Sequence, residues 1–227
     1  MRVLFVTHSY PRREHDTAGG FVLRLAAALR DVGVEVLVLA PSAQGLAALD
    51  TIEGIAVERY RYAPAKWETL AYDGTMAEQV AGSIRGKLAL GGMMAFGARA
   101  VWNAVERFRP DVVHAHWWFP SGASCALASG DRPLVMTFHG SDIRLASSSR
   151  FAPTMFRAVM SKTTAATAVS EWLANTAQRM APGHSVSVAP MPVDTALFPV
   201  ASRAPDAKLL FVGRLNAQKG LRDLLGA

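Results

Sequence analysis

The chain has 227 residues, 51% hydrophobic and 19% charged, which supports a substantial buried core and excludes a disordered chain. Its formal net charge is +6, but the basic residues are spread out, which excludes a nucleic-acid-binding arm. A diffuse positive charge suits an anionic small molecule or an anionic membrane surface, and simple solubility is the alternative explanation. A single cysteine, Cys125, excludes an intrachain disulfide and a Cys-based metal cluster, and it fits a reducing, cytoplasmic setting.

The first half of the chain predicts alternating strands and helices. Residues 3–7 form a continuous apolar run, as in a parallel strand that is covered on both faces. Gly19 and Gly20 open a helix that ends at Gly33, and strands are expected at 34–40 and 55–62. A long helical pattern follows at 76–108, with a break expected near Gly91 and Gly92. Because residues 88–105 include Arg99, we expect a core-facing helix there and not a membrane span.

The second half continues the alternation. Short apolar strands are expected at 111–115, 134–138, 165–169 and 185–189, and Ser170 is placed to cap a helix that ends near Met180. This order predicts an α/β fold with a Rossmann-like, doubly wound parallel sheet.

The final part of the chain predicts a change of domain. Four prolines occur between residues 190 and 206, which is typical of a linker. The expected organisation is a first domain at 1–189, a linker at 190–206, and at 207–227 the first strand and helix start of a second Rossmann-like domain.

Ligands of such sheets bind beyond the carboxyl ends of the strands, so polar residues at those ends are the candidates. Gly19 and Gly20 follow the first strand at a helix start, where the backbone admits a phosphate or a sugar. The alternative is that they only make a tight turn.

The segment Asp111–Gly122 places two histidines and two tryptophans at the end of one strand. His114 and His116 share a strand face and could begin a metal site, but no carboxylate or cysteine close in sequence completes it. We therefore expect a packed His114, and His116 and Trp117 lining a cleft suited to a sugar or a lipid.

Two further segments carry candidate chemistry. His139, at the end of the 134–138 strand, can hydrogen-bond a substrate hydroxyl or assist proton transfer, with Asp142 orienting it or capping the next helix. A capped structural turn is the alternative. Near the end of the chain, Arg214 and Lys219 flank a glycine turn and a helix start, a combination that favours binding of a diphosphate.

Taken together, these segments resemble the GT-B glycosyltransferases, specifically the retaining group called family 4. The resemblance rests on the order and spacing of motifs spread over the whole chain, namely Gly19-Gly20, Gly33-Val-Glu-Val-Leu-Val, Asp111-Val-Val-His-Ala-His-Trp, Thr137-Phe-His-Gly-Ser-Asp, Val169-Ser170, Val193-Asp194 with Phe198, Phe211-Val-Gly-Arg-Leu and Lys219-Gly220.

The resemblance implies a role for each matching residue. Gly19 and Gly20 would lie against the donor phosphates, and His139 would touch the transferred sugar as the catalytic residue. Arg214 and Lys219 would bind the diphosphate and stabilise its growing charge. The substrates implied are a nucleotide-sugar donor and a glycan or lipid-linked acceptor, with no metal and no cofactor.

Two departures from the family pattern affect these expectations. Met191-Pro192 stands where the family often has Asn-Gly. The family's paired glutamates, seven residues apart, would fall beyond Ala227, so we expect the 227-residue chain not to transfer sugar by itself.

Other functions are compatible with the same residues. The chain could be an inactive fragment or a stand-alone sugar- or lipid-binding module, and a GT-B sugar-nucleotide 2-epimerase shares the architecture but needs additional acid/base carboxylates. The aromatic pair Trp117-Trp118 and the basic charge favour a membrane-associated, cell-surface polysaccharide as the substrate. The expected location is cytoplasmic, with peripheral contact to an anionic membrane at the inner face of the plasma membrane.

Overall fold

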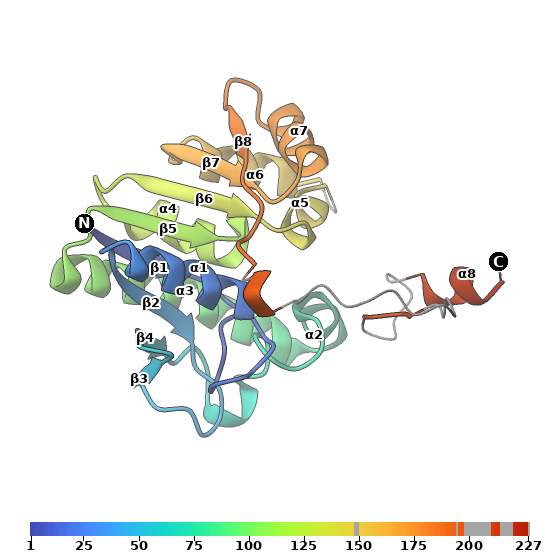
Figure 1. Ribbon diagram of the computed structural model, residues 1–227. Coiled ribbons are helices and arrows are strands. Elements are labelled where there is room, and N and C mark those ends of the chain that lie inside the picture. Colours follow the sequence, from blue (N-terminus) through green and yellow to red (C-terminus); the bar gives the residue numbers. More distant parts are fainter. Residues whose placement is uncertain (148–149, 194, 198–209, 214–219, 227) are drawn as a thin grey trace. The chain divides into compact units, whose positions relative to one another are not determined.

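The computed structural model describes residues 1–147, 150–193, 195–197, 210–213 and 220–226 (Figure 1). They belong to two units, Met1–Val193 and Asp194–Ala227. In the second unit, Thr195–Leu197 forms a 3₁₀ helix and α8 spans Leu221–Gly226. Residues 210–213 pair with no described strand, and the diphosphate candidates Arg214 and Lys219 lie outside the described residues.

The first unit is built on an eight-stranded sheet with the order β3-β4-β2-β1-β5-β6-β7-β8. Every neighbouring pair is parallel except β3 and β4, which confirms the doubly wound α/β fold. The strands are β1 Arg2–Val6, β2 Glu35–Pro41, β3 Leu49–Ile52, β4 Ile55–Tyr60, β5 Val112–His116, β6 Leu134–Phe138, β7 Ala165–Ala168 and β8 Val186–Val188.

Helices cover both faces of this sheet (Figure 1). Ser170 caps α7 by accepting a hydrogen bond from the N–H of Leu173, as predicted. The helical segments of this unit are α1 Gly20–Asp31, the 3₁₀ helix η1 Ala65–Trp67, α2 Met76–Gly82, α3 Ile84–Phe108, the π-helical turn η2 Trp118–Gly122, α4 Ala123–Ala128, α5 Ser141–Ala146, α6 Ala152–Met160 and α7 Glu171–Met180.

The continuous apolar strands are buried because alternate residues face two separate cores. From β1, Val3 and Phe5 pack with Val22 of α1, while Leu4 and Val6 join a second core with Val101 of α3. None of the helices among the described residues combines the length and the apolar character needed to cross a bilayer.

One expectation about the first unit was wrong, and one strand was missed. The helical pattern at 76–108 breaks at Ser83, which adopts an extended conformation between α2 and α3, and not near Gly91 and Gly92. Glycine is needed at position 92 for close packing and not for a helix break, because a Cβ there would lie 2.0 Å from the carbonyl oxygen of Tyr62. The short antiparallel edge strand β3 was also not predicted.

Candidate functional site

The candidate site lies where β1, β5 and β6 end side by side. In the sheet register, His116 on β5 pairs with Thr137 on β6, and His139 follows directly after β6. The Nδ1 atom of His116 therefore lies 3.1 Å from Nε2 of His139. The structure thus brings together His116, Trp117, His139 and Asp142, which the sequence had placed in two separate segments.

Aromatic rings surround the imidazole of His139. The ring centroid of Trp117 lies 4.4 Å from that of His139, and the ring of Phe21, in the first turn of α1, lies 5.0 Å away. The ring centroid of His8, which follows β1, lies 4.5 Å from that of Trp117. His139 is half-buried, in contrast to the fully buried His116.

Trp117 reaches this position through an unusual backbone conformation. Its φ angle is 65°, in the region that side chains other than glycine rarely adopt. Its N–H donates to the carbonyl of Thr137 and its own carbonyl accepts from Gly122, so both neighbours hold the strained residue. Such strain persists where the surrounding structure enforces it, often at ligand sites.

Behind His116, a chain of hydrogen bonds extends across the sheet. His114 Nε2 lies 2.7 Å from Thr137 Oγ1, which lies 2.8 Å from Thr167 Oγ1 on β7. The ring of His114 also stacks on His116 at 4.5 Å. His114 is therefore part of the packed interior, on the protein side of His116.

Burial keeps these imidazoles neutral at neutral pH. It lowers the pKa of His8 and of His114 to about 4, and that of His139 to about 3, where His114 and His8 lower it further. The pKa of the fully buried His116 also falls well below the usual value. His139 can therefore exchange hydrogen bonds with a ligand, but it does not offer a fixed positive charge.

Asp142 shapes the turn that carries His139. Its Oδ1 accepts hydrogen bonds from the backbone N–H groups of His139, at 3.2 Å, and Gly140, at 2.9 Å. Its carbonyl oxygen accepts from the indole N–H of Trp118 at 2.6 Å. Burial raises the pKa of its carboxyl to about 6. Asp142 thus acts on the backbone of His139 and lies in the first turn of α5.

Gly19 and Gly20 occupy the start of α1 at the same edge of the sheet. Gly19 has a φ of +67°, and a Cβ on it would lie 2.3 Å from the carbonyl oxygen of Ser9. At Gly20, a Cβ would meet nothing within 4 Å. Gly19 is thus required by the fold, whereas open space adjoins Gly20, where a ligand could approach the backbone.

The loop between β1 and α1 is anchored from within the domain. The buried Arg59 on β4 donates to the carbonyl of Pro11 at 2.6 Å and to Tyr72 Oη at 3.1 Å. An ion pair between Arg12 and Asp16 spans the loop, and the hydrogen bond from Arg12 lowers the pKa of Asp16 to about 2. These contacts fix the backbone beside Gly19.

Sequence reasoning missed two residues of the site. His8 could have been found, since it follows β1 just as His139 follows β6. Phe21 gave no such signal, because an apolar residue in the first turn of a helix is normally interpreted as part of the core.

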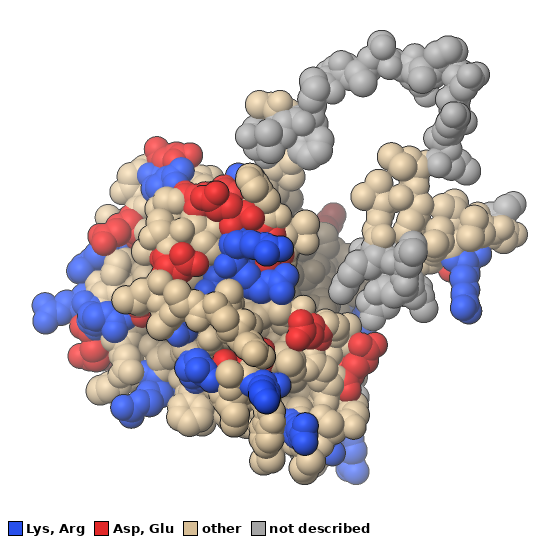
Figure 2. All heavy atoms as spheres, turned by 90° about the horizontal axis from the view of Figure 1, so that it is seen from below, with Lys and Arg blue, Asp and Glu red and all other residues tan. Residues whose placement is uncertain are grey.

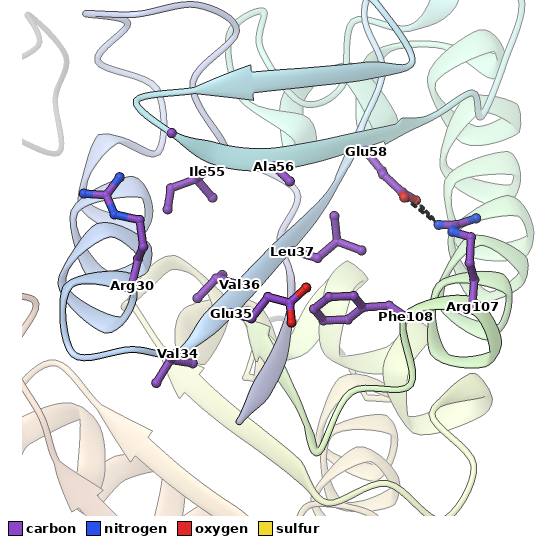
Figure 3. A pocket seen from close by; sticks show the side chains of 11 residues that line it. Arg30, Val34, Glu35, Val36, Leu37, Ile55, Ala56, Glu58, Arg107 and Phe108 are labelled. Atoms are coloured by element: carbon purple, nitrogen blue, oxygen red, sulfur yellow. Dashed lines mark hydrogen bonds and ion pairs between the residues drawn. The ribbon is translucent and has the colours of Figure 1, made fainter.

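Elsewhere, a cavity of about 460 Å³ lies at the opposite edge of the sheet (Figure 3). It is lined by the amino ends of β2 and β4 and the last turns of α1 and α3, and Arg107 pairs there with Glu58. Parallel sheets bind ligands at the carboxyl ends of their strands, so the histidine edge remains the candidate site. Among the described residues, no group of three or more His, Cys, Asp or Glu is arranged to hold a metal ion.

The solved structures that this fold resembles are GT-B glycosyltransferases. Sucrose-phosphate synthase from Thermosynechococcus elongatus aligns with a TM-score of 0.72 and 15% identity, covering 100% of this chain and 59% of that one. Anabaena HepE, solved in complex with UDP-glucose, aligns with a TM-score of 0.53 and 18% identity, covering 100% of this chain and 50% of that one.

The profile of Glycosyltransferase Family 4 matches residues 18–197, and the chain belongs to this family. It is 28% identical over 255 residues to glycogen synthase of Mycobacterium tuberculosis H37Rv, covering 100% of this chain and 57% of that protein. It is 30% identical over 130 residues to a Bacillus subtilis protein named as the teichuronic acid biosynthesis glycosyltransferase TuaC, covering 51% of this chain and 33% of that protein. The chain thus spans 57% of the length of glycogen synthase.

Proposed function

We propose that residues 1–193 form the acceptor-side half of a retaining glycosyltransferase. The reaction would move a hexosyl group from a nucleoside-diphosphate sugar to a glycan or a lipid-linked acceptor. The observation that carries the proposal is the neutral, half-buried His139 beside the open backbone of Gly20, at the ligand-binding edge of the sheet. The UDP-glucose complex of HepE and the names of the curated relatives support this choice of substrates.

In this proposal, the bond between the anomeric carbon of the sugar and the diphosphate oxygen breaks, and negative charge grows on the diphosphate. The N-terminus of α1, where open space adjoins Gly20, and the cations Arg214 and Lys219 would stabilise that charge without a metal or a cofactor. His139 would hold the transferred sugar by a hydrogen bond. His116 and Trp117, which contact the ring of His139, would help to form the cleft for the sugar and the acceptor. Asp142 would support that cleft through its hydrogen bond to the backbone of His139.

The whole reaction would need more than residues 1–193. Because a GT-B site lies between two domains, we propose that donor binding depends on a second domain and that the 227-residue chain alone does not turn over. An inactive fragment or a stand-alone sugar-binding module is the second candidate. Turnover by the purified 227-residue chain would overturn the dependence on a further domain.

The decisive test measures sugar transfer by the longest natural polypeptide that contains this chain, with a panel of nucleoside-diphosphate sugars. His139→Ala should lower kcat at least tenfold, because a hydrogen bond to the reacting sugar would be lost. His184→Ala, in the turn between α7 and the amino end of β8 and so at the opposite edge of the sheet, is the matched control and should leave kcat unchanged. Equal activity of the two variants would contradict the role of His139.

We further propose a peripheral contact with anionic membranes through the outer face of α3. Ile84, Leu88 and Trp102 are exposed there, at 70%, 59% and 56%, and helical spacing places them on one face. Lys87 and Arg99 flank this stripe. Figure 2 shows one surface of the molecule, on which basic and acidic side chains are interspersed.

Flotation with vesicles that contain anionic lipid tests the membrane contact. Leu88→Gln with Trp102→Gln should reduce binding at low salt, because the variant exposes less apolar surface to the headgroup region. Trp172→Gln, at an exposed tryptophan on α7, is the control. Failure of the unmodified chain to float would rule out the contact.

A further inference from the structure

We propose that His116 is a positioning residue that fixes His139 in one tautomer, with its ring hydrogen on Nδ1. His139 would therefore meet a ligand as a hydrogen-bond donor. The consequence for sugar transfer rests on the proposed function, but the tautomer can be measured without it.

The contact between the two rings is closely defined. His116 Nδ1 and His139 Nε2 lie 3.1 Å apart, and the ring planes are nearly parallel, at 29° with centroids 5.3 Å apart. His116 is fully buried, and its second nitrogen, Nε2, has no hydrogen-bond partner among the described residues. One hydrogen must lie between Nδ1 of His116 and Nε2 of His139 for the bond to form.

The unpartnered Nε2 of His116 decides which ring donates. Both imidazoles are neutral, because burial lowers both pKa values, so each ring carries one hydrogen. If His139 donated, the hydrogen of His116 would sit on the buried Nε2 without an acceptor, at a cost of roughly 1–3 kcal/mol. If His116 donates from Nδ1, only an acceptor lone pair remains unpaired. The second arrangement is therefore favoured.

The neighbouring histidines leave this arrangement unchanged. His114 stacks on His116 but is bonded to Thr137, and His8 contacts the ring of Trp117. Neither is hydrogen-bonded to His116 or His139 within the described residues. The tautomer of His139 is therefore set by the single bond from His116.

This assignment limits what His139 can do. Its Nε2 accepts from His116, so Nδ1 is the ring atom left for a ligand, and Nδ1 carries the hydrogen. An N–H group recognises an oxygen lone pair, such as that of a sugar hydroxyl, and it cannot accept a proton. His139 thus acts as a donor to the bound sugar and not as a general base.

The tautomer is measured by long-range ¹H–¹⁵N NMR spectroscopy of the 227-residue chain, with the His139 signals assigned through His139→Gln. We expect a protonated Nδ1 and an unprotonated Nε2 on His139. A protonated Nε2 would overturn the proposal. The measurement is independent of sugar transfer, so a missing transferase activity would leave it standing.

The role of His116 is tested by removing the bond while keeping a flat ring in its place. His116→Phe should shift the Nε2 signal of His139 toward the protonated range, and His116→Asn, which keeps a donor at the position of Nδ1, should restore it. His114→Phe, which removes a neighbouring histidine that does not bond His139, is the control. An unchanged tautomer in His116→Phe, or in His116→Ala if the Phe variant does not fold, would contradict the proposal.

Discussion

At the scale of single residues, the neighbours Gly19 and Gly20 are expected to have different roles. Gly19 is needed for the fold, and Gly20 leaves space for a ligand. Gly19→Ala would place a Cβ against the Ser9 carbonyl at positive φ, and we expect a loss of stability of about 1–3 kcal/mol. Gly20→Ala meets no protein atom, so its thermal unfolding midpoint should stay close to that of the unmodified chain. Thermal unfolding followed by circular dichroism makes the comparison, and equal losses would contradict it.

Gly20 is also expected to affect binding of the nucleotide sugar, which measurements of transfer activity can detect. A methyl group at Gly20 would fill the open space at the start of α1, so Gly20→Ala should raise KM for the nucleotide sugar although the domain stays folded. Unchanged kinetics in a folded Gly20→Ala protein would place the donor elsewhere.

The histidines of the candidate site make the stability of the fold depend on pH in a defined direction. His8, His114 and His139 have folded-state pKa values of about 4, 4 and 3, below the unfolded value of about 6.5. Between these values the unfolded chain binds more protons, so stability should fall as pH drops from about 6.5 to 4. The pKa of Asp142 is raised to about 6 in the folded protein, so below that pH the folded state binds one more proton at this residue than the unfolded chain does. Asp142 therefore makes the fold more stable as the pH drops, which partly offsets the effect of the histidines.

Comparing the pH dependence of the unfolding midpoint in two variants checks this prediction. His139→Gln should reduce the slope between pH 6.5 and 4, because one group that must charge on unfolding is gone. Asn175→Gln, which changes an exposed side chain without a titratable group, should keep the original slope. Parallel slopes for both variants would contradict the assignment of neutral His139.

At the scale of elements, Gly91 and Gly92 on α3 show how neighbouring glycines can have opposite effects. A Cβ at Gly92 would lie 2.0 Å from the Tyr62 carbonyl oxygen, so Gly92→Ala should push α3 from the strand end and destabilise the domain by about 1–3 kcal/mol. Gly91 is exposed and open, so Gly91→Ala should stabilise it by up to about 1 kcal/mol, by helix propensity. Chemical denaturation of both variants tests the signs.

That glycine pair also explains where sequence-based prediction succeeded and failed. Buried parallel strands carry long apolar runs, so Leu134–Phe138 was predicted with the bounds that β6 has. The sequence cannot show that Gly92 serves a contact with a distant carbonyl, or that Ser83, and not a glycine, interrupts the helix. The edge strand β3 has one buried residue, Ile52, and hence almost no pattern.

The candidate site was predictable for a related reason. Topology alone places His116, Trp117 and His139 at one edge, because parallel strands end together there. The hydrogen bond between the two histidines depends on the sheet register and on rotamers, which the sequence does not contain. The position of Trp117 likewise depends on a positive φ that no tryptophan would be expected to adopt.

At the scale of the whole molecule, the hydrophobic clusters formed by the described residues belong to the first unit. The three hydrophobic clusters use residues between Val3 and Val186, and none uses a described residue of Asp194–Ala227. Since the cooperative unfolding of a domain depends on its core, we expect a chain ending at Val193 to fold by itself. Its thermal midpoint should lie within a few degrees of that of the 227-residue chain.

The same truncation also tests whether residues after Val193 contribute to the stability of the domain or to the geometry of the candidate site. Calorimetry of the two chains should give one cooperative transition each, with similar enthalpies, because both chains contain the three hydrophobic clusters of the described residues. The His139 tautomer should be identical in both, since His116 and the aromatic rings around His139 all lie before Val193. A large loss of midpoint or a changed tautomer in the shorter chain would mean that residues after Val193 support the site, and the boundary at that residue would then be wrong.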